Sequence, residues 1–68
     1  MEQSSNLGTP MQILEEALKR EQAAYNFYSS VRDHVKSDLV RELAEQLCEE
    51  ERRHAQLIEK QILKLRRG

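Results

Sequence analysis

The chain has 68 residues, 38% hydrophobic and 34% charged, with a net charge of −1 and a single cysteine. So small a chain buries little apolar area and this one cannot form an internal disulfide, so we expect a bound metal or oligomerisation to stabilise it. The mixed charges exclude a basic patch for nucleic acid, and no apolar run resembles a membrane span or a signal peptide, so we expect a soluble, cytoplasmic protein.

The first helix is predicted over residues 10–35. The residues before it, 1–9, are small and polar, and we expect a flexible tail there. Thr9 can cap the helix, Pro10 has the φ angle of a first helical position, and Gln12 stands where a capping box returns its hydrogen bond. Apolar residues then recur at alternating spacings of three and four, which predicts one broad buried face.

The second helix is predicted over residues 38–66. The apolar pattern weakens at residues 32–36, after which Ser37 can act as an N-cap and Asp38 places a carboxylate at the positive helix end. The connection near residues 34–37 is short, so the two helices should be antiparallel. The apolar face of the second helix comprises Val40, Leu43, Ala44, Leu47, Leu57, Ile58, Ile62 and Leu65.

The predicted fold class is all-α, an antiparallel two-helix hairpin over residues 10–68. Helices of this length would make a hairpin about 40 Å long and would leave one side of each apolar face exposed. The simplest way to cover that side is a twofold dimer in which two hairpins form a four-helix bundle. We therefore expect a homodimer or a higher homo-oligomer.

Two carboxylates and an imidazole should meet inside this hairpin. Glu21 is the one charge in the apolar row of the first helix. Glu51 and His54 lie three residues apart in the apolar row of the second helix, so they share one side of it. Each lies roughly 14 residues or slightly more from the centre of the connection, so they share one height. A carboxylate on a buried row is costly unless it is paired. We predict that Glu21, Glu51 and His54 bind metal, and a twofold axis would bring four carboxylates and two imidazoles together.

The predicted ligands favour iron or, alternatively, manganese, with zinc less favoured, because carboxylate oxygen is a hard ligand and imidazole an intermediate one. Bridging carboxylates can hold two cations for redox chemistry with dioxygen or peroxide. Tyr28 lies about two turns beyond Glu21 on the same face, and its hydroxyl is a candidate hydrogen-bond partner for the site. We expect a non-haem di-iron or di-manganese protein whose site is shared between subunits.

Other interpretations of the same residues remain open. Glu50 is a rival to Glu51, because a spacing of four also places it on one face with His54. Glu21 could pair with an arginine across the bundle, and residues 49–53 could form a solvated face with pairs inside one helix. The chain would then be a metal-free helical hairpin that serves oligomerisation or partner binding. That alternative must explain clustered carboxylates, which repel one another when no cation is present.

Residues 21–28 (EQAAYNFY), followed by residues 51–54 (ERRH), resemble the first half of a rubrerythrin-type ferritin-like domain. The resemblance covers residues 12–65 and implies a ferritin-like four-helix bundle with a di-iron site. The second helix pair of that family and a Cys-x-x-Cys electron-transfer domain are missing from this sequence. Encapsulated ferritins are similar in this respect, because they are two-helix chains that complete a ferroxidase centre between subunits. The resemblance therefore implies iron oxidation or peroxide reduction.

Overall fold

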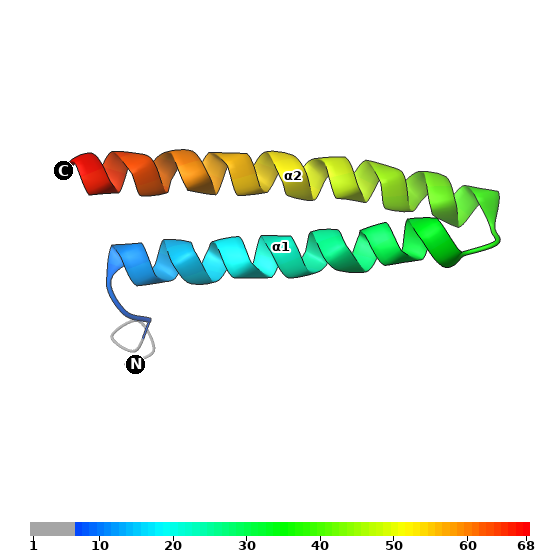
Figure 1. Cartoon of the computed structure of the whole chain (residues 1–68), viewed down its shortest axis with the longest axis horizontal. Helices are drawn as coiled ribbons and strands as arrows, with labels where there is room; N and C mark the ends of the chain where they lie inside the picture. The colour runs from blue at the N-terminus through cyan, green and yellow to red at the C-terminus, as the bar shows by residue number, and fades with distance from the viewer. Residues whose placement is uncertain (1–6) are drawn as a thin grey trace.

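The computed structural model describes residues 7–68, and within them the chain forms two long helices. Helix α1 spans Pro10–His34 and helix α2 spans Asp38–Arg67. They lie side by side and antiparallel in a hairpin whose longest dimension is 45 Å (Figure 1). This confirms the predicted all-α hairpin, although α1 ends one residue earlier and α2 one residue later than predicted. Residues 1–6 of the predicted tail lie outside the described residues.

The start of α1 is fixed by the predicted capping box. The Thr9 hydroxyl accepts a hydrogen bond from the Gln12 amide at 3.1 Å, and the Gln12 side-chain oxygen accepts one from the Thr9 amide at 2.9 Å. Gly8 precedes this box with a φ of +95°, and a Cβ there would collide with the Gln12 side-chain oxygen. The chain therefore needs glycine at this position to enter the helix.

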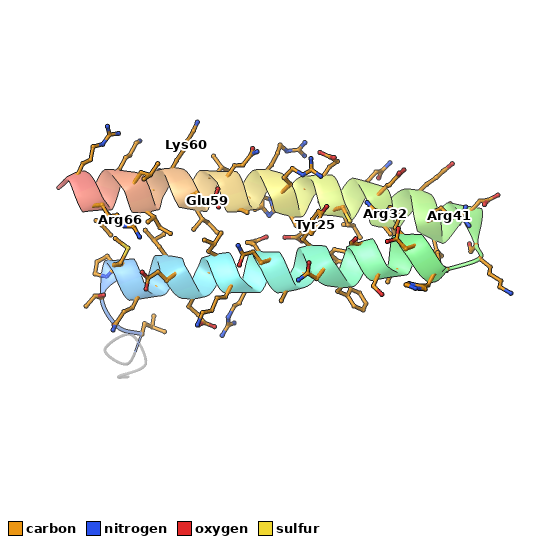
Figure 2. All side chains as sticks on the ribbon, in the orientation of Figure 1. Tyr25, Arg32, Arg41, Glu59, Lys60 and Arg66 are labelled. Carbon is orange, nitrogen blue, oxygen red and sulfur yellow. The ribbon has the colours of Figure 1, made fainter. Side chains whose placement is uncertain are left out.

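The connection between the helices is short and held at both ends. The Ser37 hydroxyl accepts a hydrogen bond from the Val40 amide at 3.2 Å, as expected of an N-cap. Arg41 pairs with Asp38 and donates to the Val35 carbonyl at 3.1 Å, so its side chain ties α2 to the end of α1 (Figure 2). Three residues separate the helices, and this sets which turn of α1 faces which turn of α2.

The contact between the helices is thin and depends on small side chains. Ala44, Cys48 and Ile62 are the buried apolar residues of the described chain, and all three belong to α2. The Cys48 sulfur lies 3.9 Å from the Tyr25 carbonyl oxygen, so α1 approaches α2 closely there. Cys48, the single cysteine of the chain, is buried and is not in a disulfide. A core this small leaves most apolar side chains of the hairpin without cover.

The uncovered side chains gather mainly on one side of the hairpin. The apolar face comprises Val40, Leu43, Leu47, Leu57 and Leu65 on α2 and Phe27 and Val31 on α1. The two α1 residues line one groove together with Val40, Leu43 and Leu47. Phe27 is 63% exposed and Leu43 52% exposed. Lys60 points away from the hairpin in Figure 2. Neither helix in residues 7–68 is long and apolar enough to cross a membrane.

Candidate metal centre

Three side chains of metal-ligating type meet near the middle of the hairpin. Glu21 projects from α1, whereas Glu51 and His54 project from consecutive turns of α2. One ligand atom from each residue lies within 4.8 Å of the other two. The straight helices and short connection bring the three residues to one height, which is the arrangement that the sequence predicts.

Glu21 supplies the observation that tests whether a cation suits this place. Its Oε1 is buried and has no hydrogen-bond partner within the described part of the chain. The Nδ1 atom of His54 lies 3.5 Å from this oxygen and 3.7 Å from Oε1 of Glu51. A buried carboxylate oxygen without a partner is costly, and two carboxylates with an imidazole form a donor set for iron or manganese. The residues present therefore fit a metal ion.

The carboxyl group of Glu21 perturbs that of Glu51 in the metal-free molecule. The pKa of Glu51 is raised above its ordinary value, first because its protonated carboxyl can donate a hydrogen bond to the carboxylate of Glu21 and then because it is partly buried. The negative charge of Glu21 raises it further, while His54 acts in the opposite direction. The protonated form of Glu51 is therefore favoured beside the Glu21 carboxylate. A cation bound between them would take the place of that proton.

His54 is more exposed than the sequence indicates. The apolar row around it suggests an inner position, but its side chain is 54% exposed, whereas Glu51 is 17% exposed. Successive residues of a helix are about 100° apart, so His54 lies about 60° around α2 from Glu51, away from α1. Leu43, Leu47 and Leu57 lie on that same side. His54 thus lies within the apolar face, between Leu43 and Leu47 around the helix, where a second chain packed on that face would cover it.

Two further residues were predicted near the site. Glu50, the rival ligand, is exposed and is not among the residues whose ligand atoms cluster. Tyr28 lines the groove of the apolar face, where its ring stacks edge-on with Phe27 at 5.3 Å between centroids. Its role as a hydrogen-bond partner for the ligands stays a prediction.

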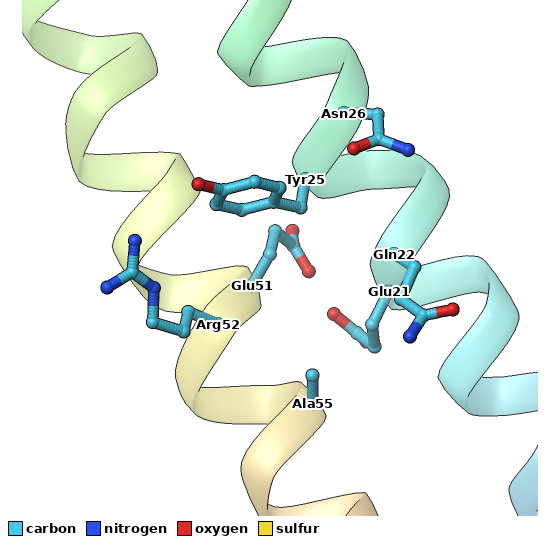
Figure 3. Close-up of a pocket in the computed structure, with 7 residues that line it drawn as sticks. All are labelled: Glu21, Gln22, Tyr25, Asn26, Glu51, Arg52 and Ala55. Atoms are coloured by element: carbon cyan, nitrogen blue, oxygen red, sulfur yellow. The ribbon is translucent and has the colours of Figure 1, made fainter.

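A pocket of about 190 Å³ opens beside the carboxylates, on the side away from the apolar face. Its lining is Glu21, Gln22, Tyr25, Asn26, Glu51, Arg52 and Ala55 (Figure 3). Arg52 lies over the Tyr25 ring, with its guanidinium carbon 5.8 Å from the ring centroid, and is 3.8 Å from a Glu49 oxygen. A hydrogen bond with Tyr25 and the charge of Glu49 raise the pKa of Arg52.

Sequence reasoning missed this pocket, although it contained one usable signal. Tyr25 follows Glu21 by four residues and therefore lies on the same side of α1. In the single hairpin Tyr25 lines the pocket together with Glu21 and Glu51. Nothing in the sequence pattern identified Arg52 as its partner, because that contact depends on how the two helices face each other.

The chain was compared with protein-family models, with curated proteins and with solved structures. The family model Rubrerythrin matches residues 12–68, a range that includes both helices and all three candidate ligands. No curated protein and no solved structure matches. The family suggests a di-iron carboxylate protein, and the cluster of two glutamates and a histidine is of the kind that could bind metal. Together the motif, the fold and the match show that this chain belongs to the rubrerythrin family.

Proposed function

We propose that this chain is a non-haem di-iron protein, or alternatively a di-manganese protein, that oxidises ferrous iron or reduces peroxide at a centre shared between two copies. The observation that supports it best is the convergence of Glu21, Glu51 and His54 around a buried carboxylate oxygen without a partner. Three ligands from one hairpin are too few to surround two cations, whereas two copies supply four carboxylates and two imidazoles.

The position of His54 supports the sharing. It lies within the apolar face, with Leu43 and Leu47 before it and Leu57 after it on the same side of α2. A second copy packed on this face would bury these side chains and enclose the imidazole. A twofold axis near His54 would then place the ligands of the two chains opposite each other.

Each residue has a defined task in such a centre. Glu21 and Glu51 would hold the cations through their carboxylate oxygens, and His54 would add a neutral nitrogen ligand. Bound iron or manganese supplies electron transfer to dioxygen or peroxide. The partial burial of both carboxylates, 25% and 17% exposed, limits competition from water for their oxygens.

A metal-free interaction module is the second candidate, and the exposed apolar face favours it. Such a module needs the apolar face but has no use for the unpartnered oxygen of Glu21. Metal analysis distinguishes the two functions. Protein purified without chelators should contain about one iron or manganese ion per chain, measured by plasma mass spectrometry. Protein that contains no metal and takes up neither Fe(II) nor Mn(II) would favour the module.

The shared centre also requires a dimer, which one substitution should weaken. Leu43→Lys places a charge in the middle of the apolar face and should shift the chain from dimer toward an 8.0 kDa monomer. Leu63→Lys is the matched control, because Leu63 is 55% exposed, close to the 52% of Leu43, but lies on another side of α2. Sedimentation velocity at micromolar concentration measures both. A parent that is itself a compact, stable monomer would exclude the shared centre.

A further inference from the structure

The charges of helix α2 change sign near its middle. Residues 38–51 carry six carboxylates and one arginine, a net charge of −5, whereas residues 52–67 carry six lysines or arginines and one glutamate, a net charge of +5 with His54 neutral. The change falls between Glu51 and Arg52, at the middle of the helix and at the level of the candidate ligands. We call residues 38–51 the acidic half of α2 and residues 52–67 its basic half.

The apolar face extends along both halves. Near the connection, Phe27 and Leu43 belong to one groove between the helices. Near the two ends of the chain, Ile13 and Leu65 belong to another. Leu65 lies within about 60° of Leu43 around α2, counted at about 100° per residue, so both grooves open on the same side of the hairpin. A second hairpin can therefore lie along the whole face, across the level of His54.

A second hairpin can lie on this face in either of two directions. With its connection at the same end, like halves of the two α2 helices share a level and repel one another. With its connection at the opposite end, the two α2 helices are antiparallel and each acidic half lies beside a basic half. Glu42 is about 15 Å from the level of Arg52, and Lys60 and Lys64 are about 12 Å and 18 Å on the other side. The opposite direction thus brings Glu42 level with the partner's Lys60 and the partner's Lys64.

We propose that a second copy of the chain lies on the apolar face with its connection at the opposite end, so that each acidic half of α2 faces the basic half of the partner's α2. This inference rests on the proposed function, in which a second copy covers this face, and it adds the direction of that copy. Exposed charge pairs add little affinity, whereas facing like charges are costly. The apolar side chains therefore supply the affinity, and the charges select the direction.

The test cross-links full-length chains that each carry one new cysteine, in a Cys48→Ala background. Leu47 and Leu57 lie equally far from Arg52, on either side of it. In the proposed dimer, a chain with Leu47→Cys and a chain with Leu57→Cys bring their thiols to one level, where a short bismaleimide joins them. In either variant alone, the two thiols are about 15 Å apart along the helices and stay unjoined. Denaturing electrophoresis detects a product of twice the 8.0 kDa chain mass.

A mixture of Leu47→Cys and Phe27→Cys chains is the matched comparison. Phe27 and Leu47 line one groove of the hairpin, so they share a level, and a second copy in the same direction would place its α1 along α2 and join this pair. We expect covalent dimer from the Leu47 and Leu57 mixture and little from this one. The reverse result, or no joining of either pair in protein that sediments as a dimer, would overturn the inference and leave the shared centre standing. A monomeric parent would exclude both.

Charge reversal gives an independent measurement of the same direction. Lys64→Glu should raise the dissociation constant of the dimer about threefold to tenfold at low ionic strength, because each copy then faces an acidic half with a carboxylate. Glu42→Lys in the same chain should restore most of the loss. Sedimentation equilibrium measures both. A dimer that becomes tighter on Lys64→Glu would show that the basic halves face each other, which contradicts the proposed direction.

Discussion

Glu51→Ala should remove most of the metal from this protein, whereas Glu50→Ala should leave the metal content close to that of the parent. Glu51 places an oxygen within 4.8 Å of ligand atoms from Glu21 and His54, while Glu50 is exposed and outside this cluster. Groups that only support a metal ligand are worth about 10–100-fold in affinity, so loss of a ligand should cost at least that much. Isothermal titration with Mn(II), after removal of bound metal, gives the affinities.

The pair Glu51→Ala and Glu50→Ala controls for charge, since both variants lose one carboxylate from the same turn of α2. A general loss of negative charge would weaken metal binding equally in the two. If Glu50→Ala loses the metal and Glu51→Ala retains it, the assignment of the ligand on α2 is wrong by one residue. If both retain it, the cluster of Glu21, Glu51 and His54 is not where the metal binds.

The features of the fold that could be predicted from the sequence are those that depend on residues close together in the chain. The capping box of Thr9 and Gln12 and the N-cap at Ser37 each involve residues three apart, so local chemistry determines them. The height of the candidate ligands could also be predicted. A helix rises by a constant amount per residue, so counting from a short connection locates Glu21 opposite Glu51.

The direction in which side chains point around each helix was harder to predict. A small rotation of α2 about its axis exchanges inner and outer positions, and the contacts that set this rotation are few and involve small residues such as Ala44 and Cys48. The sequence pattern therefore gave His54 an inner position that the hairpin does not provide. Packing against α2 likewise decides that Tyr25 lines the pocket beside Glu21 and Glu51.

The titration of Glu51 should make the metal-free protein more stable at mildly acidic pH than at neutral pH. Because its pKa is raised in the folded state, the native protein binds more protons than the unfolded chain at pH values above the ordinary glutamate value of 4.5. The free energy of unfolding contributed by Glu51 therefore falls as pH rises through this window. Urea unfolding of metal-free protein at a series of pH values measures it, and Glu51→Gln, which cannot ionise, should remove this contribution.

Metal should reverse the sign of this pH dependence. Carboxylates and imidazole must be deprotonated to bind a cation, and a cation that binds only the folded dimer stabilises it by mass action. Added Fe(II), kept anaerobic, or Mn(II) should therefore raise the melting temperature at pH 7. The rise should shrink as the pH is lowered, because protons then compete with the metal for the ligand atoms. Differential scanning calorimetry with and without Mn(II) measures the difference.

A triple variant separates the metal effect from the repulsion between carboxylates. Replacing Glu21, Glu51 and His54 together by leucine removes the clustered charges, so this variant should melt higher than the metal-free parent at pH 7. It should also show no change with Mn(II), because no ligand is left. A parent shown to be metal-free whose melting temperature is unchanged by any divalent cation at pH 7 would refute the di-metal centre. The exposed apolar face would then be the feature that explains the chain, and an interaction module its better description.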